Sequence, residues 1–224
     1  MRYIDKSNCC AEFDKYVNND SPSVWDEFKT DIKLKLHQHL WREQQGLCIY
    51  CQQEVPEKKE TEYKIRSHIE HIRPRRGHNP DKYAHLIFCY KNLSVSCEGF
   101  DCKMDDSLNP KKEFCEHNKE NEYDEYKFLN PVECRDIEDY FSYGIDGTIH
   151  PNNNKNDEDK SKAQYMIKTL YLNHPTLTDM RKKQYQLIIQ EQEKGLDIKD
   201  FLNPHYELPG FYTMLKQLFL QLGV

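Results

Sequence analysis

The clearest hydrophobic pattern lies near the N-terminus, where apolar residues recur at steps of three or four over residues 24–41. These residues are Val24, Trp25, Phe28, Ile32, Leu36, Leu40 and Trp41. Such spacing places one apolar stripe along a helix. Ser21-Pro22-Ser23 before it is typical of a helix start, and Gly46 after it is a typical stop. We therefore predict one helix here, preceded by the mixed residues 1–20.

Residues 63–69 alternate between polar and apolar positions, as a half-buried strand does. This predicted strand leads directly into Glu70 and His71. The following stretch, 74–80, contains two prolines and a glycine and predicts a loop. A short helix is predicted over 102–108, because Asn109-Pro110 would end it.

The second half of the chain changes from polar connections to helices. Residues 113–127 are acidic and predict a solvated connector. Residues 137–149 predict two strands around glycine-containing turns. After an Asn-rich break at 151–159, three apolar stripes predict helices over 163–171, 175–195 and 211–219.

We expect an α+β fold in four segments. They are an N-terminal helical segment (1–47), a central core (48–112), a connector with a β-hairpin (113–150) and a C-terminal helical segment (151–224).

Composition supports a folded protein. The mean hydropathy of −0.96 indicates a well-solvated chain, yet 15 Tyr and 10 Phe supply enough bulk for a core. No run is long enough for a membrane-spanning helix, and residues 1–5 lack the apolar core of a signal peptide. We expect a soluble, cytoplasmic protein without a membrane partner.

The net charge of −6 argues against wholesale wrapping by nucleic acid, but the charge is unevenly distributed. Basic residues gather in the central core at Arg66, Arg73, Arg75 and Arg76. They are either a solvated surface or contacts to a nucleic-acid backbone, which position a strand without reading its sequence. We favour backbone contacts.

Nine cysteines without a secretion signal favour thiols and metal ligands over disulfides. Cys48-x2-Cys51 and Cys97-x4-Cys102 are two close pairs from separate parts of the chain, as in structural zinc sites. A redox Cys-x-x-Cys would need a thioredoxin-like context, which is missing. The cysteines that we treat as structural or incidental are Cys89, Cys115 and Cys134, although Cys115-Glu116-His117 is an alternative source of ligands.

Glu70-His71 is the candidate for chemistry. A neutral imidazole can take a proton from water, and a carboxylate can hold a divalent ion that polarises a phosphoryl oxygen. The alternative is a packed or surface histidine. Adjacent strand residues point to opposite faces, so both serve one site only if the strand ends there, which Pro74 favours.

Together these residues resemble an HNH endonuclease of the ββα-metal type with an embedded zinc ribbon. The resemblance lies in Cys48-x2-Cys51, Glu70-His71-Ile72-x-Pro74, Asn92-Leu93, Cys97 and Cys102. Within that superfamily the chain is similar to the PtuB-type nucleases of Septu and retron anti-phage systems. The tracts that carry this likeness are Leu129-Asn130-Pro131, Tyr140-Phe141-x-Tyr143, Asp146-Gly147-Thr148-Ile149 and Thr169-Leu170-Tyr171-Leu172-Asn173.

The resemblance implies a zinc-stapled ββα-metal nuclease core at 48–112. It implies that His71 is the general base, that Glu70 binds the catalytic ion and that Asn92 orients the base and braces the loop. The implied zinc ligands are Cys48, Cys51, Cys97 and Cys102.

The chain departs from the family at the third HNH position. Lys103 stands there, and a cation is a poor ligand. Of the nearby carboxylates Asp101, Asp105 and Asp106, we choose Asp106, which lies one helical turn beyond Lys103.

The implied activity is hydrolysis of phosphodiester bonds as the toxic effector of an anti-phage complex, with Mg²⁺ or another divalent ion. Water is the nucleophile, so DNA and RNA, including tRNA, are both admissible substrates. The implied partners are a PtuA-type ATPase and, in retrons, a reverse transcriptase with its RNA–DNA hybrid. The C-terminal helices and the acidic connector are the expected docking surface for such a partner; the alternative is that the helices simply complete the core. The alternatives are a non-catalytic zinc-ribbon adaptor, which binds nucleic acid or the ATPase, and a thiol redox protein without zinc.

Overall fold

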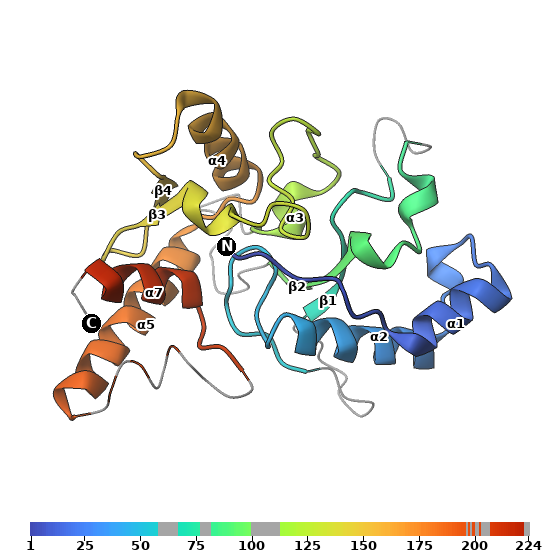
Figure 1. The fold of residues 1–224 in the computed structure, drawn as a ribbon, viewed down its shortest axis with the longest axis horizontal. Coiled ribbons are helices and arrows are strands. Elements are labelled where there is room, and N and C mark those ends of the chain that lie inside the picture. Colours follow the sequence, from blue (N-terminus) through green and yellow to red (C-terminus); the bar gives the residue numbers. More distant parts are fainter. Residues whose placement is uncertain are drawn as a thin grey trace, which may run out of the picture.

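The computed structural model describes residues 1–57, 67–76, 82–99, 113–195 and 207–221, together with 197, 199 and 202. Figure 1 shows a central hairpin beside two N-terminal helices, and a C-terminal group of helices around a second hairpin. The helices are α1 (Ala11–Asp20), α2 (Thr30–Glu43), α3 (Glu116–Lys119), α4 (Asp157–Thr169), α5 (Pro175–Glu193) and α7 (Tyr212–Gln221). The strands are β1 (Ser67–His71), β2 (Leu93–Cys97), β3 (Phe141–Tyr143) and β4 (Ile149–Pro151). Short 3₁₀ turns are η1 (Trp25–Glu27), η2 (Ala84–Leu86), η3 (Tyr90–Asn92) and η4 (Ile137–Tyr140).

The prediction of one helix over residues 24–41 was wrong. The chain forms the turn η1, becomes extended at Phe28 and then begins α2, while α1 lies in the segment that showed no pattern. The break lets Phe28 pack against Phe13 and Trp25, with ring centroids 5.8 and 5.0 Å apart. Burial of these rings outweighs helical continuity, because fully burying one large apolar side chain contributes roughly 1.5–3 kcal/mol.

The central hairpin pairs β1 and β2 antiparallel, with Ser67 opposite Cys97 and His71 opposite Leu93. Residues 63–66 of the predicted strand lie outside the described residues, as does the predicted helix over 102–108. Helix α2 packs on β2. The buried amide of Gln44, just after α2, accepts from Val95 N at 2.6 Å and donates to Val95 O at 2.8 Å. This clamp places the loop after α2 beside β2.

The segment predicted as a solvated connector contributes to the core instead. Phe114, Cys115 and Lys119 are buried, and Cys115 N donates to Leu170 O at 2.8 Å. Acidic residues exposed along the same segment explain the misleading pattern, because a short helix buries only one side.

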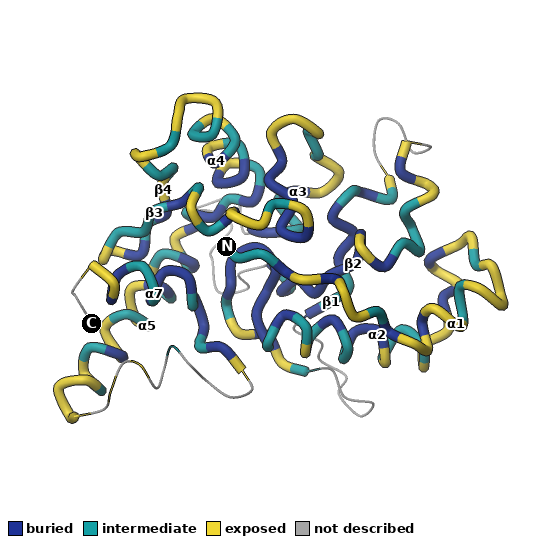
Figure 2. Tube along the Cα trace, viewed as in Figure 1, coloured by how far each residue is buried: buried dark blue, intermediate teal, exposed yellow. Residues whose placement is uncertain are grey.

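The predicted C-terminal elements are present. Strands β3 and β4 pair antiparallel, and α4 begins at Asn156, whose side chain accepts from Asp159 N at 2.9 Å. One hydrophobic core runs from Met1 to Leu177, and a second lies between α5 and α7. Figure 2 shows the buried inner course of the chain between these elements. Among the described residues, none of the helices has the length and apolar character that a membrane span needs.

Candidate nuclease site and zinc centre

Four buried cysteine sulfurs, those of Cys48, Cys51, Cys97 and Cys115, lie within 4.8 Å of one another. Cys48 and Cys51 sit on the loop after α2, Cys97 ends β2, and Cys115 precedes α3. Around tetrahedral zinc, with Zn–S near 2.3 Å, the sulfurs lie about 3.8 Å apart. The Cys51 and Cys97 sulfurs are 3.8 Å apart, so the residues present fit this ion.

The close packing of the thiols favours one thiolate, at Cys48, while burial and hydrogen bonds to the neighbouring sulfurs raise the pKa values of Cys97 and Cys115. Burial opposes ionisation of Cys48, but hydrogen bonds from the other three thiols outweigh it and hold the pKa of Cys48 well below its usual value. Cys115, which the sequence analysis treated as incidental, thus supplies a fourth sulfur. Cys102 lies outside the described residues, so its assignment as a ligand stays a prediction that competes with Cys115.

Glu70 and His71 line one pocket of about 400 Å³, although they are neighbours on β1. Strand β1 ends at His71 and the chain bends at Ile72 and Arg73, so the alternation of faces ends there. The geometric objection from the sequence is thereby removed.

His71 is held at two sides. Its Nε2 lies 3.0 Å from Ile87 O, and since a carbonyl only accepts, Nε2 carries the proton and Nδ1 keeps a lone pair. The ring of Trp25 meets the imidazole edge to face, with centroids 4.3 Å apart. Burial, aided by the charge of Arg75, lowers the pKa of His71 to about 3. The imidazole is therefore neutral near pH 7.

Asn92 braces the chain beyond β1. Its Oδ1 accepts from Arg73 N at 2.8 Å, and its Nδ2 donates to Arg73 O at 3.0 Å and Leu86 O at 3.2 Å. These bonds fasten the bend after His71 to the segment that presents Ile87 O. The geometry is that of the brace expected at this position, and the catalytic role stays a prediction.

Glu70 is engaged from inside the protein. Its Oε1 accepts from Tyr50 Oη at 2.8 Å and from Lys119 Nζ at 2.8 Å. Both donors are buried, and Lys119 comes from α3. The arrangement fixes one carboxylate oxygen of Glu70.

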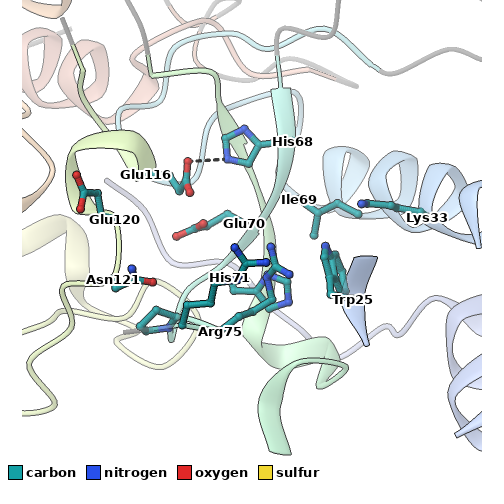
Figure 3. Close-up of a pocket in the computed structure, with 12 residues that line it drawn as sticks. Trp25, Lys33, His68, Ile69, Glu70, His71, Arg75, Glu116, Glu120 and Asn121 are labelled. Carbon is teal, nitrogen blue, oxygen red and sulfur yellow. Dashed lines mark ion pairs between the residues drawn. The ribbon is translucent and has the colours of Figure 1, made fainter. Parts of the chain in front are cut away.

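A second group of metal-type ligands lies around Glu70. Ligand atoms of His68, Glu70 and Glu116 are within 4.8 Å of one another, and His68 Nε2 is 3.1 Å from Glu116 Oε2. Figure 3 shows Glu116 between His68 and Glu70. His117 Nδ1 approaches the same Glu116 oxygen at 3.0 Å. Burial raises the pKa of Glu116, but hydrogen bonds from His117 and His68 prevail and hold it below its usual value, so Glu116 is ionised.

The opposite wall of the pocket is cationic. Lys33, Arg75 and Arg76 line it, and Figure 3 shows Lys33 on the side of Trp25, away from Glu116. Arg73 is not among the lining residues. Its guanidinium forms a bidentate pair with Glu133, at 2.7 and 3.1 Å. Arg66 lies outside the described residues.

No family model matches the chain. A curated protein of Vibrio cholerae serotype O1 biovar El Tor, named "Retron Vc95 putative HNH endonuclease", is 30% identical over 192 residues, 83% of each chain. The chain belongs to the HNH endonuclease family. Its small antiparallel hairpin followed by a short helix is compatible with that assignment.

In this HNH chain the structure brings Glu70, His71 and Asn92 into one region, and their roles in catalysis stay predictions. Asp106, proposed for the third position, lies outside the described residues, and among those that the structure describes Glu116 offers a carboxylate beside Glu70. Sequence reasoning missed Trp25, Lys33 and Lys119. Only the tripeptide Cys115-Glu116-His117, which was noted as an alternative ligand source, pointed to this part of the site.

Proposed function

We propose that this HNH protein is a metal-dependent endonuclease that hydrolyses phosphodiester bonds of DNA or RNA as the toxic effector of a retron-type anti-phage system. The observation that carries the proposal is the state of His71. Its Nε2 proton is committed to Ile87 O, which leaves Nδ1 as an acceptor inside a pocket with carboxylates on one wall and cations on the other.

The chain's own residues supply the proton chemistry. A neutral His71 accepts a proton from a water molecule, which then attacks phosphorus. Arg75 and Arg76 hold the phosphate by charge-assisted hydrogen bonds. As negative charge from the phosphate enters the pocket, it offsets the effect of Arg75 and makes His71 a stronger base.

His68, Glu70 and Glu116 are the residues that would hold a divalent ion. Two carboxylates and an imidazole form a suitable donor set, and the Glu70 oxygen not used by Lys119 and Tyr50 is available to it. When bound, such an ion would polarise the phosphoryl oxygen and stabilise the leaving oxygen.

Zinc bound by the four cysteines would be a structural ion that holds the parts of this site together. Cys115 directly precedes α3, and Lys119 N donates to Cys115 O at 2.9 Å. Fixing Cys115 to the hairpin therefore fixes Glu116 and Lys119 against Glu70. This connection explains why one short stretch contains both kinds of site.

The relative is named as an HNH endonuclease of a retron. We propose a PtuA-type ATPase as partner, as in Septu systems, with a reverse transcriptase and its RNA–DNA hybrid as the element that restrains the nuclease. The C-terminal helices α5 and α7 are the docking surface in this proposal.

The test is cleavage of plasmid DNA, single-stranded DNA and tRNA by purified protein with its partner and Mg²⁺ or Mn²⁺. His71→Ala should abolish cleavage and phage protection. His85→Ala, which removes an exposed imidazole from η2, should leave both intact. Full cleavage by His71→Ala would refute His71 as the general base, and a wild-type protein that cleaves none of these substrates would refute the proposed nuclease function.

A non-catalytic zinc-ribbon adaptor is the second candidate. Lys119 favours it, because an ammonium bound to Glu70 already neutralises the carboxylate that the ion would use. Zinc-loaded protein that binds nucleic acid or the ATPase but cuts none of the three substrates would establish this function.

A further inference from the structure

The turn η1 lies against the nuclease pocket, although the sequence placed it in a supporting segment. Trp25 packs on His71, and Asp26 follows it directly. Asp26 Oδ1 lies 3.5 Å from Arg75 Nη1, and its Oδ2 lies 3.3 Å from Arg76 Nη2. One carboxylate thus bridges both arginines of the cationic wall.

A bridging carboxylate presents to two guanidinium groups what a phosphodiester presents: two oxygens that share one negative charge. The Asp26 and Arg76 side chains are 68% and 72% exposed. Ion pairs this exposed are weak, so a ligand of the same charge can displace Asp26. Arg75 is 29% exposed and its guanidinium lies 5.7 Å from the Trp25 ring, which holds it in place when its partner changes.

We propose that Asp26 is an internal competitor for the substrate phosphate, which occupies Arg75 and Arg76 until nucleic acid displaces it. The inference rests on the proposed function, because it concerns the same pocket. Trp25 and Asp26 belong to one turn, so displacement of Asp26 changes the charge beside the Trp25 indole while the ring stays packed on His71.

The experiment uses the full chain and inorganic pyrophosphate as probe. The chain has two tryptophans, Trp25 and Trp41, so Trp41→Phe leaves Trp25 as the only indole that reports on the turn. Addition of pyrophosphate should change the fluorescence emission of Trp25, and the change should saturate as the concentration rises. Asp26→Asn should lower the dissociation constant roughly three- to tenfold, since two weak competing pairs are lost.

Asp20→Asn is the matched control. This substitution removes the same charge from the same part of the chain. Asp20 pairs with exposed Lys29 and does not line the pocket. Arg76→Gln should remove most of the gain from Asp26→Asn, because one of the competed groups is then missing. Trp41 Nε1 donates to Val55 O at 2.7 Å, and Trp41→Phe removes this bond. If that variant does not fold, pyrophosphate binding is measured by calorimetry on proteins that keep Trp41.

Equal pyrophosphate affinities of Asp26→Asn and Asp20→Asn would overturn the inference, and so would the absence of saturable binding to both. Failure of the proposed function is a separate result. If the protein is not a nuclease, it cleaves no substrate, but the pyrophosphate titration can still give the expected result. If the protein cleaves nucleic acid but Asp26→Asn does not change its affinity for pyrophosphate, only the role of Asp26 as a competitor is refuted.

Discussion

Lys119 Nζ lies 2.8 Å from Oε1 of Glu70, and the two side chains are only 1% and 5% exposed. Tyr50 donates to the same oxygen from the loop between the first two zinc-type cysteines. The pair therefore joins α3, β1 and this loop around one carboxylate. Since neither charge is solvated, each depends on the other.

Lys119→Met should be strongly destabilising, because it leaves a carboxylate buried without its cation. We expect the free energy of unfolding to fall by roughly 3–5 kcal/mol in urea titrations. Lys119→Met/Glu70→Gln should recover part of that loss. Lys183→Met, which breaks an exposed pair with Asp179, should cost less than about 1 kcal/mol. If Lys119→Met and Lys183→Met lower the free energy of unfolding by similar amounts, Lys119 and Glu70 do not form a buried charge pair.

Cys115 and Cys102 can be distinguished by zinc content. If Cys115 completes the tetrahedron, Cys115→Ser should lose bound zinc and melt at a lower temperature, while Cys102→Ser keeps one zinc per chain. Cys134→Ser is the control, because Cys134 is not part of the cluster. Elemental analysis of freshly purified protein gives the answer, and the opposite result would assign the fourth position to Cys102. Zinc-free wild-type protein would instead support the thiol redox alternative.

Asn92→Ala should release the bend after His71. It removes three side-chain hydrogen bonds, and each buried group left unsatisfied costs roughly 1–3 kcal/mol. We expect faster hydrogen exchange at the Arg73 amide and a loss of cleavage. Asn154→Ala, at an exposed position, should change neither. Unchanged exchange at Arg73 would contradict the role of Asn92 as a brace.

His71 should make the fold sensitive to acid. Its pKa is about 3 in the folded protein and near 6.5 when unfolded, so the unfolded state binds more protons between these values. Stability should thus fall as the pH drops from about 6.5 towards 3. His71→Phe should lose less stability than wild type between pH 7 and pH 4.5 in urea titrations. His85→Phe should follow the wild-type curve.

His68 should influence which divalent ion binds. An imidazole nitrogen suits Mn²⁺ better than Mg²⁺, which prefers oxygen ligands. We expect tighter binding of Mn²⁺ than of Mg²⁺, measured by electron paramagnetic resonance of free Mn²⁺ with Mg²⁺ as competitor. His68→Asn should weaken Mn²⁺ binding and reduce this preference, and His85→Asn should not. Equal effects of both variants would exclude His68 as a ligand.

Local patterns in the sequence are sufficient to predict those elements whose signals span only a few residues. Cys48 and Cys51 form a turn that presents two sulfurs because only two residues separate them, and Glu70-His71 ends a strand because Pro74 follows. The C-terminal helices follow from apolar periodicity, and the family resemblance rests on such short tracts. Each depends on neighbours within a few residues, so a linear pattern is sufficient.

Which residues lie beside these elements could be learned only from the folded chain. Cys115 joins Cys97 although an acidic stretch surrounds it, and Lys119 reaches Glu70 from a helix of four residues. Trp25 packs on His71 although it belongs to a turn that lies 46 positions earlier in the chain. These contacts arise from packing and from the need to pair buried charge, and neither leaves a periodic trace in the sequence.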